Sequence, residues 1–414
     1  MKIAMVSEHA SPLAPLGGVD AGGQNVHVGE LAAAFAGRGH DVTVYTRRDD
    51  PDTATEVMTG AGYRVVHVPA GPPEPIPKDA ILPHLGEFAG FLHRHWTPDP
   101  PDIVHAHFWM SGLATALAVR GSGIPVVLTF HALGTVKRRY QGSADTSPPS
   151  RIKFERLIAT RADRVIATCR DEVAELERMG VPRSRASVVP CGVDLSLFTP
   201  DGKVADRADG MRRLVSVGRL VRRKGFDTAI RALPLLPDTE LLIAGGGGSD
   251  HADQSELRRL VRIAAEYGVS DRVRLLGQVP RAHVPELLRS ADVVVCTPWY
   301  EPFGMVPLEA MACGKPVLAS AVGGMLDTVV DGVTGALVAP EPEPVATALA
   351  DLLTDRVRRR AMGAAGQRRA RTHYSWDQVA DTTLSVYRRL VPARRAAAAA
   401  KAVTTTPFTT EGAL

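Results

Sequence analysis

The chain has 414 residues, of which 45% are hydrophobic and 23% are charged, and its formal net charge is +4. A globular chain of this length exceeds one ordinary hydrophobic core, so two domains are expected. So mild a charge permits acidic small-molecule substrates and gives no indication of a nucleic-acid partner.

The amino terminus, the apolar runs and the cysteines bear on location. Met1 and Lys2 lead directly into a strand-like run, so no signal peptide is expected. No apolar run reaches the length that spans a membrane. The four cysteines show no metal-ligand spacing, which favours reduced thiols. The sequence therefore predicts a cytoplasmic protein without a transmembrane segment, and it leaves a homodimer open.

Strand-like runs alternate with helix-like segments through the first part of the chain. A Gly-rich loop follows the first run and leads into a helical segment that ends near Arg38. Such alternation predicts a parallel, doubly wound sheet, whose ligands bind beyond the carboxyl ends of the strands. The strands predicted here are 2–7, 41–46, 64–68, 102–107, 125–130 and 163–168.

A second alternating series follows the polar stretch 200–210 and indicates a second Rossmann-like domain. After it, an amphipathic helix is predicted for 376–390. Residues 392–414 are rich in Ala, Thr and Arg without periodicity, so they are predicted to form a disordered tail. The strands predicted in the second series are 213–219, 240–244, 272–279, 291–298 and 316–320.

The segment between Glu301 and Glu309 combines the features of a nucleotide-sugar site. A buried strand precedes it, and a helix follows the turn at Phe303 and Gly304. Backbone amides from Phe303 to Met305 and Val306 at this helix start can hold a diphosphate. Glu309 can accept two ribose hydroxyls through its two oxygens, and Glu301 can reach the sugar. Taken alone, two Glu eight apart are also common on solvated helices.

This Glu-x7-Glu segment resembles the signature of glycosyltransferase family 4, retaining GT-B enzymes that include sucrose-phosphate synthase and the mycothiol-pathway inositol-phosphate N-acetylglucosaminyltransferase. The resemblance extends to about residue 390. It implies an α/β fold of the GT-B type, with two Rossmann-like, doubly wound parallel-sheet domains facing across a cleft. Residues 1–196 would bind the acceptor and residues 197–375 the nucleotide sugar, and helix 376–390 would return to the first domain.

The resemblance also implies the reaction. A hexose or N-acetylhexosamine would move from a nucleotide sugar, with a UDP-sugar favoured, to a hydroxyl of a small polar or phosphorylated acceptor. Retaining members are thought to pass the acceptor proton to the leaving phosphate. In agreement, no carboxylate in the first half of the sequence stands out as a buried base. The donor is a substrate, so no cofactor is expected.

Two cations and several glycines are the further donor candidates. Arg219 and Lys224 flank a turn at a strand end, where they can clamp a diphosphate, although Arg222 and Arg223 between them also fit a solvated charge run. The pattern Gly-Arg-Leu-x-x-x-Lys-Gly, which includes Gly218, matches the family. The resemblance further implies that Gly23 faces the donor phosphate and that the segment containing Gly277 lines the base pocket.

Three histidines, His105, His107 and His131, lie at predicted strand ends. The resemblance identifies His131 as the active-site histidine that hydrogen-bonds the sugar. His107 is interpreted as a loop or core residue with a smaller claim to function. A zinc site built from the three is disfavoured, because their spacing matches no usual ligand pattern.

The acceptor residues follow from the resemblance only in part. Asn25, Lys78 and Arg151 occupy positions that match acceptor-binding residues of the inositol-phosphate enzyme. Two further phosphate contacts of that enzyme, a Tyr and a Thr, are Met110 and Ala132 here. Half of that phosphate cradle is therefore missing, and Lys137 is the residue that can compensate.

Features of the sequence disfavour a metal site and two other enzyme classes. The sequence Asp50-Pro51-Asp52 is a literal Asp-x-Asp without supporting context, so no essential metal is predicted. A nucleotide-sugar epimerase shares the two-domain fold, but its usual carboxylates are not evident. A dinucleotide oxidoreductase shares the sheet, but the chain lacks Gly-x-Gly-x-x-Gly followed by a ribose-binding acid.

Overall fold

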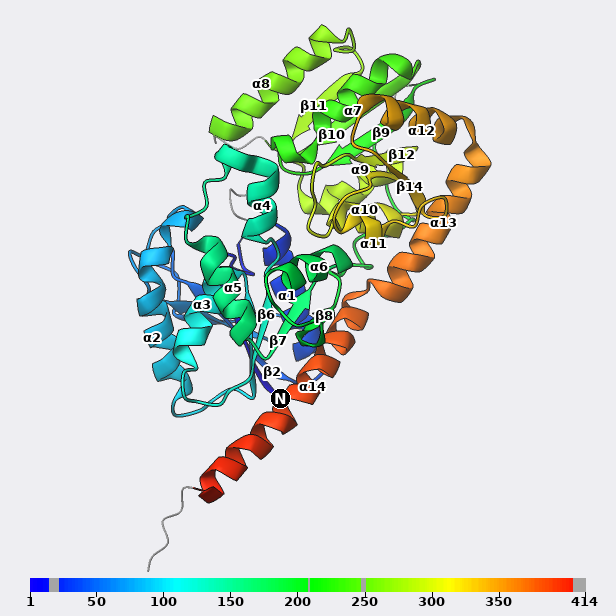
Figure 1. Cartoon of the computed structure of the whole chain (residues 1–414). Coiled ribbons are helices and arrows are strands. Elements are labelled where there is room, and N and C mark those ends of the chain that lie inside the picture. Colours follow the sequence, from blue (N-terminus) through cyan, green and yellow to red (C-terminus); the bar gives the residue numbers. More distant parts are fainter. Residues whose placement is uncertain (15–21, 208, 247–250, 405–414) are drawn as a thin grey trace, which may run out of the picture.

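A computed structural model of the chain describes residues 1–14, 22–207, 209–246 and 251–404. Two α/β domains follow each other along the chain, and each is built on its own parallel sheet (Figure 1). Two long helices at the end of the chain run along one side of both domains (Figure 1). The two-domain, doubly wound architecture predicted from the alternating pattern is therefore present.

The first sheet has eight strands in the order β3-β4-β2-β1-β5-β6-β7-β8. Neighbouring strands are parallel, except that the edge strand β3 is antiparallel to β4. The central strands are apolar on both faces because helices cover both sides of the sheet. The strands are β1 Lys2–Val6, β2 Asp41–Arg47, β3 Glu56–Met58, β4 Arg64–Val68, β5 Ile103–His107, β6 Val126–Thr129, β7 Arg164–Ala167 and β8 Ala186–Val188. The helices are α1 Gly23–Ala36, α2 Leu85–Trp96, α3 Trp109–Ala118, α4 Gly134–Gln141, α5 Arg151–Arg161 and α6 Arg170–Arg178.

The second sheet has six strands in the order β11-β10-β9-β12-β13-β14, and all neighbours are parallel. The strands are β9 Arg212–Val217, β10 Thr239–Ala244, β11 Val273–Gly277, β12 Val293–Cys296, β13 Val317–Ser320 and β14 Gly335–Val338. The helices are α7 Phe226–Ala232, α8 His251–Glu266, α9 Val284–Ser290, α10 Met305–Ala312, α11 Met325–Thr328, α12 Pro342–Thr354 and α13 Arg356–His373.

The last helix, α14 (Trp376–Thr404), leaves the second domain and packs on α1 of the first (Figure 1). The chain passes between the domains twice at one place, where the Val193 amide donates to the Tyr374 carbonyl at 2.8 Å. The helix is longer than predicted, because it continues through Pro392 to Thr404 instead of giving way to a tail at 392. Ala has the highest helix propensity of any residue type, so the Ala run at 396–400 favours this continuation. The rest of the predicted tail, 405–414, lies outside the described residues.

The carboxyl ends of strands in both sheets face the space between the domains. Contacts across that space join segments that follow strand ends. The Tyr140 ring stacks on the Tyr300 ring at 5.2 Å, and the Cys169 thiol donates to the Pro302 carbonyl at 3.2 Å. Because open parallel sheets bind ligands at this edge, the interdomain cleft is the place for the functional site.

Candidate functional site

Two helix amino ends meet across the cleft. Gly23 opens α1 in the first domain and Met305 opens α10 in the second. A Cβ atom on Gly23 would lie 3.3 Å from Met305 Sδ, so the two helix ends are in close contact. The first N–H groups of a helix have no partner within the helix, and the helix dipole is positive there. Converging amide groups from both domains form a site that suits a phosphate.

The turn before α10 is shaped by Gly304, which has a φ of +89°. A Cβ at this position would lie 2.8 Å from Met325 Sδ. Phe303 is buried in the core of the second domain, whereas Met305 and Val306 are only partly buried. The turn therefore anchors one side chain and leaves the following backbone at the cleft.

Glu301 is surrounded by cations of the loop that follows β9. Lys224 Nζ lies 2.5 Å from Glu301 Oε2, and Arg223 Nη1 lies 3.5 Å from the same oxygen. The Arg219 charge also acts on both Glu301 and Lys224. The turn Arg222–Lys224 is thus folded against the loop after β12, and Lys224 lies inside the cleft.

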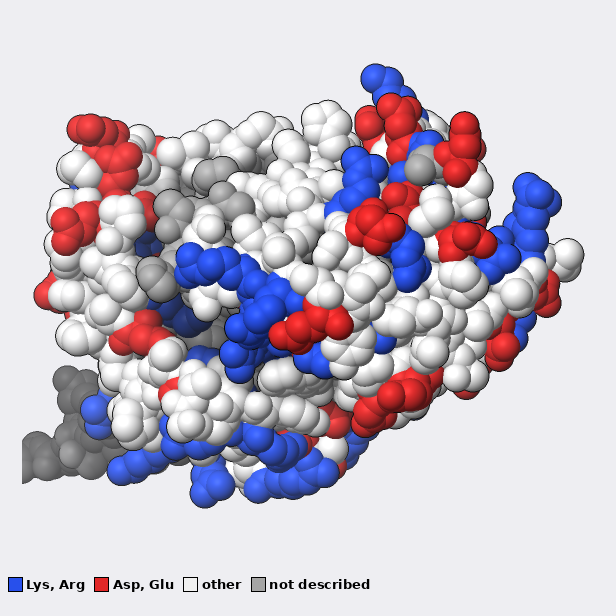
Figure 2. Space-filling view, turned by 90° about the horizontal axis from the view of Figure 1, so that it is seen from above, with Lys and Arg blue, Asp and Glu red and all other residues white. Residues whose placement is uncertain are grey.

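The charge balance around Glu301 is positive. Burial by itself would raise the pKa of Glu301, but Lys224, Arg223 and Arg219 outweigh burial, so the pKa lies below its ordinary value. Burial lowers the pKa of Lys224, and the Glu301 carboxylate opposes this shift. One carboxylate therefore faces three cations, and the remaining positive charge is available to an anionic ligand. In the view from above, Lys and Arg side chains gather beside a hollow in the surface (Figure 2).

Glu309 lies buried on α10, where it pairs with a residue that the sequence did not single out. Arg281 Nη1 donates to Glu309 Oε1 at 3.2 Å, and the Arg281 guanidinium lies over the Phe198 ring at 5.3 Å. Burial raises the pKa of Glu309, and Arg281 opposes this shift. One of the two oxygens expected to accept ribose hydroxyls is therefore engaged by Arg281.

Glycines line the ends of three adjacent strands beside this loop. Gly218, with a φ of +155°, donates its amide to Ala244 at 2.9 Å, and Gly245 donates to Gly277 at 2.8 Å. A Cβ on Gly245 would lie 1.7 Å from the Gly218 carbonyl oxygen. These strand ends therefore approach one another too closely for any side chain at Gly245, and they form a flat backbone surface at the cleft.

His131 and Phe108 follow β6 and β5 in strained backbone conformations. Among the described residues, three that are not glycine have a positive φ, and Phe108 at +80° and His131 at +59° are two of them. Such conformations cost free energy and persist only where the surrounding structure enforces them. The His131 Nε2 atom lies 3.0 Å from His107 Nδ1, so the structure brings these two predicted strand-end histidines together.

Three of the predicted acceptor residues lie around Phe108 and Ser147. Lys78 Nζ lies 5.7 Å from the centre of the Phe108 ring, and the Arg151 guanidinium lies 5.0 Å from it. Lys137 Nζ and Arg151 Nη1 both donate to Ser147 Oγ, at 2.9 and 3.1 Å. These three cations therefore lie in one part of the first domain.

Acidic side chains contact both Arg151 and Lys137. Arg151 Nε donates to Glu155 Oε1 at 2.7 Å, and both side chains are buried. Lys137 Nζ lies 3.0 Å from Asp145 Oδ1. Although burial raises the pKa of Asp145, hydrogen bonds from Ser147 and Lys137 outweigh burial and lower the pKa to about 2. The positive field at Phe108 is thus weaker than three uncompensated cations would give.

Asn25 has a structural task within the first helix turn. Its Oδ1 accepts from the Gly22 amide at 3.0 Å, and its Nδ2 donates to the Ser11 carbonyl at 2.8 Å. Met110 is fully buried, and the Ala132 carbonyl accepts from Arg151 Nη2 at 2.6 Å. Neither Met110 nor Ala132 supplies a side-chain hydroxyl or amide to a phosphate.

The first domain contains a buried carboxylate that the sequence did not reveal. Glu8 follows β1 and is completely buried. His9 Nδ1 lies 2.6 Å from Glu8 Oε1, and the Ser111 hydroxyl donates to Glu8 Oε2. This half thus contains buried carboxylates, Glu155 among them, although the sequence predicted only that none stands out as a buried base. Both Glu8 oxygens are engaged, so the carboxylate is not placed to take a proton from an acceptor directly.

Asp50 and Asp52, the literal Asp-x-Asp, lie in an exposed loop after β2, and the Asp52 amide donates to Asp50 Oδ1 at 2.8 Å. Across residues 1–14, 22–207, 209–246 and 251–404, no group of three or more His, Cys, Asp or Glu side chains is arranged to hold a metal ion. Within the described part of the chain, no helix combines the length and the apolar character needed to cross a membrane.

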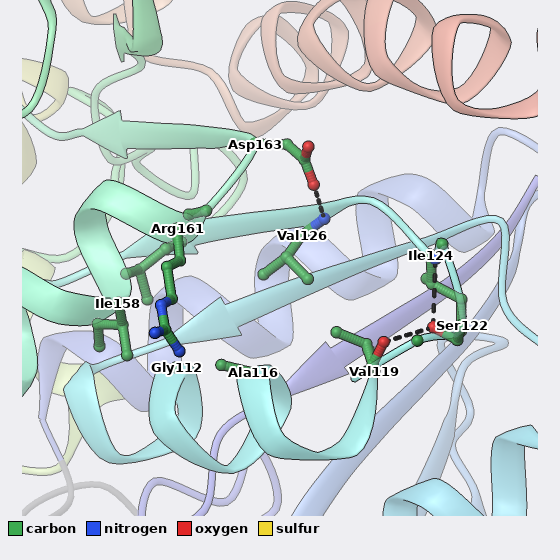
Figure 3. Close-up of a pocket in the computed structure, with 13 residues that line it drawn as sticks. Gly112, Ala116, Val119, Ser122, Ile124, Val126, Ile158, Arg161 and Asp163 are labelled. Carbon is green, nitrogen blue, oxygen red and sulfur yellow. Dashed lines mark hydrogen bonds between the residues drawn. The ribbon is translucent and has the colours of Figure 1, made fainter. Parts of the chain in front are cut away.

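A cavity of about 510 Å³ lies at the opposite edge of the first sheet. It opens between the carboxyl-terminal ends of α3 and α5 and the beginning of β6, beside Ala116, Val126, Ile158 and Arg161 (Figure 3). Its walls are mostly apolar. Because ligands of open parallel sheets bind at the carboxyl ends of the strands, this cavity is not a candidate for the transfer site.

Known proteins resemble the chain along almost its whole length. Residues 21–197 match the family described as Glycosyltransferase Family 4, and residues 202–369 match Glycosyl transferases group 1. A D-inositol 3-phosphate glycosyltransferase from Mycolicibacterium vanbaalenii is 38% identical, with 95% of this chain and 91% of the relative covered. The chain is a glycosyltransferase of family 4. A relative of the same name from Kineococcus radiotolerans is also 38% identical, with 95% and 97% covered.

Solved structures agree with this assignment. Sucrose-phosphate synthase from Thermosynechococcus elongatus is 33% identical and superposes with a TM-score of 0.87, over 94% of this chain and 99% of that one. Anabaena HepE, solved in complex with UDP and glucose, is 20% identical with a TM-score of 0.71 over 93% and 99%, which shows the shared fold. The fold is therefore GT-B, and the glycosyltransferase prediction is confirmed over the epimerase and the oxidoreductase.

Proposed function

We propose that this glycosyltransferase moves a hexose or N-acetylhexosamine from a UDP-sugar to a hydroxyl of a phosphorylated cyclitol or sugar, with retention at the anomeric carbon. The observation that carries the donor half is the contact of Gly23 with Met305 at two helix amino ends, beside the cations around Glu301. Amides and cations from both domains then surround one place in the cleft where a diphosphate fits.

The residues of this place would act on the leaving group. As the bond to the sugar breaks, negative charge grows on the diphosphate, and Lys224, Arg219 and the helix amides lie where they stabilise it. Glu301 holds Lys224 in place through the 2.5 Å contact and keeps an oxygen for a sugar hydroxyl. Glu309 and Arg281 would bind the ribose together, and the glycine-lined strand ends would receive the base.

The engaged state of Glu8 supports retention. Because His9 and Ser111 occupy its oxygens, the leaving phosphate would take the acceptor proton. His131 would hydrogen-bond the donor sugar from the edge of the first sheet. The acceptor hydroxyl then attacks on the face from which the phosphate departs, which keeps the anomeric configuration.

The phosphorylated acceptor is supported by charge and by the relatives. Lys78, Lys137 and Arg151 converge on Phe108 and Ser147. The relatives described above are named D-inositol 3-phosphate glycosyltransferase and sucrose-phosphate synthase, and both names contain a phosphate ester. Because Met110 and Ala132 contribute no hydroxyl, Lys137 would supply the contact that is missing here.

The test is a matrix of donors and acceptors. The purified chain is incubated with UDP-glucose or UDP-N-acetylglucosamine and with inositol phosphate, hexose phosphates or the same compounds without phosphate. UDP release is measured, and the anomeric configuration of the product is read by proton NMR. We expect release with phosphorylated acceptors and an α-linked product. Equal rates with unphosphorylated acceptors, or a β-linked product, would contradict the proposal.

A further inference from the structure

A layer of buried histidines lies directly behind His131. His105 and His107 are on β5, His27 is on α1, and all three are almost completely buried. The His105 and His107 ring centres are 4.1 Å apart, and the His27 ring is 5.0 Å from the His131 ring. His131 itself is only partly buried. It is thus the member of the layer that reaches the cleft.

The returning helix α14 closes this layer on the other side. The Tyr387 hydroxyl lies 2.6 Å from His105 Nδ1, and Thr129 Oγ1 lies 2.9 Å from His105 Nε2. The Trp376 ring packs on the His27 ring at 5.4 Å. Among the described residues, the layer contacts hydroxyls and aromatic rings and no carboxylate. His105 is therefore satisfied by its own partners and does not hydrogen-bond to His131.

All four rings are neutral at neutral pH. Burial lowers the pKa of His27 to about 4 and that of His105 to about 3. Burial and the neighbouring rings hold the pKa values of His107 and His131 well below the ordinary value. A neutral imidazole has one N–H donor and one acceptor nitrogen. The hydrogen bond between His107 and His131 therefore fixes both tautomers together.

Two arrangements of the proton satisfy the 3.0 Å contact between His107 Nδ1 and His131 Nε2. In the first, His107 Nδ1–H donates, and His131 carries its proton on Nδ1. In the second, His131 Nε2–H donates, and His107 carries its proton on Nε2. The two arrangements differ in whether His107 Nε2 carries a proton, and this atom is buried without a hydrogen-bond partner among the described residues. The first arrangement leaves a lone pair there, and the second leaves an unpaired N–H group. Among buried backbone groups, an N–H without a partner is rarer than an under-satisfied acceptor, and the same preference favours the first arrangement here.

We propose that His107 is a positioning residue for the transfer reaction: its Nδ1–H donates to His131 Nε2 and so keeps His131 in the tautomer with a proton on Nδ1. This inference rests on the proposed function, because the role of His131 at the donor sugar belongs to that proposal. The Nδ1–H group is then the free edge of His131. It can donate to a hydroxyl or to an oxygen that gains negative charge as the sugar bond breaks, which the opposite tautomer cannot do.

The tautomer can be observed without substrates. In the full chain labelled with ¹⁵N-histidine, a two-bond nitrogen–proton spectrum reports which imidazole nitrogen carries the proton. The His131 signals are identified by their loss in His131→Gln. We expect the wild-type protein to show His131 protonated on Nδ1 at pH 7.5. We expect His107→Leu to shift His131 toward the other tautomer. A wild-type His131 protonated on Nε2 would overturn the proposal.

Kinetics separate positioning from packing. His107→Leu is expected to lower kcat for UDP release by about 10²-fold, the scale of one misplaced electrostatic donor, with little change in donor KM. His107→Asn keeps an N–H group near Nδ1 and is expected to retain activity within about 10-fold of wild type. The control His105→Leu removes an equally buried histidine that does not bond to His131, and we expect wild-type tautomer and kcat within a few-fold. Equal losses in His105→Leu and His107→Leu would also overturn the proposal. If no UDP-sugar supports turnover while His131 is protonated on Nδ1, only the proposed function has failed.

Discussion

Lys224 lies in the cleft with an acidic partner and neighbours of its own sign, and we expect this arrangement to let its charge act on a leaving diphosphate. We predict that Lys224→Ala lowers kcat/KM for the donor by about 10²-fold or more, because one preorganised cation is lost from a water-poor site. Steady-state UDP release measures this. The matched control is Arg222→Ala, which removes an exposed cation from the same turn and is expected to leave kcat/KM within about two-fold. Near-normal activity of Lys224→Ala would show that Lys224 does not act on the donor.

Substitutions of the predicted acceptor cations differ in how much they would destabilise the fold. Arg151→Ala would leave the Glu155 carboxylate buried and unpaired, which costs about 3–5 kcal/mol and confuses folding with binding. Lys78→Met is the more conservative change, because Met keeps a long apolar side chain and removes the charge that lies 5.7 Å from the centre of the Phe108 ring. We predict that it raises acceptor KM about 10-fold or more and leaves donor KM nearly unchanged. Lys153→Met, an exposed lysine on α5, is the control. An unchanged acceptor KM in Lys78→Met would speak against an anionic acceptor.

The residues that sequence reasoning found and missed differ in a physical way. Lys224 and Glu309 lie in short patterns that can be compared along the chain. The partner of Glu309, Arg281, is 28 residues away in the sequence and reaches it through the tertiary fold of the second domain. In the sequence Arg223 fits a solvated charge run, whereas in the structure its turn packs against Glu301. Such pairs depend on tertiary geometry, and no local pattern announces them.

At the scale of elements, neutral histidines are enclosed by α1, β5, β6 and α14. Their burial makes the stability of the fold depend on pH. The folded-state pKa values of His27 and His105 are about 4 and about 3, below the ordinary 6.5. As pH falls below 6.5, the unfolded chain binds protons before the folded chain does. The stabilisation that these neutral histidines give the folded state is therefore fully present above pH 6.5 and is lost progressively as the pH falls toward about 4. Each such histidine contributes a slope of up to about 1.4 kcal/mol per pH unit.

We therefore predict a lower melting temperature at pH 5.5 than at pH 7.5, as measured by differential scanning fluorimetry. His27→Phe removes one titrating group whose Nδ1 has no hydrogen-bond partner among the described residues, so it is expected to flatten this dependence. His93→Gln, a change at an exposed histidine, serves as the control and should keep the wild-type slope. A pH slope in His27→Phe equal to that of wild type would show that His27 is not held neutral.

The elements themselves were largely predictable where they are long or central. The buried parallel strands read as continuous apolar runs, so β1, β5, β6 and β12 were expected near their observed bounds. The edge strand β3 has three residues, two of them exposed, and it gave no such run. The sequence does not predict the extension of α14 beyond residue 390, because residues from Pro392 onward lack helical periodicity.

At the scale of the whole molecule, each domain has its own hydrophobic core. Contacts between the two domains hold the two sides of the cleft together. Arg170 Nε lies 2.6 Å from Asp327 Oδ1, and the Tyr140 ring stacks on the Tyr300 ring. The family resemblance was enough to predict two domains facing each other. Which side chains touch across the gap could not be predicted, because the contacts join loops far apart in the sequence whose relative position depends on both sheets.

The last prediction concerns metal and belongs to the cleft as a whole. Many enzymes neutralise a diphosphate with a divalent cation, but here Lys224, Arg223, Arg219 and two helix amino ends converge from two domains on one place. We predict that UDP release persists in excess EDTA and that saturating UDP raises the melting temperature equally with and without EDTA. At 100 times Kd, such binding adds about 2.7 kcal/mol to stability. UMP is the matched control, because it keeps the base and ribose but lacks the second phosphate, so its shift should be smaller. Lys224→Ala should reduce the difference between the two nucleotides. Activity that disappears in EDTA and returns with Mg²⁺ or Mn²⁺ would show that the protein's own positive charge is insufficient and that a metal completes the site.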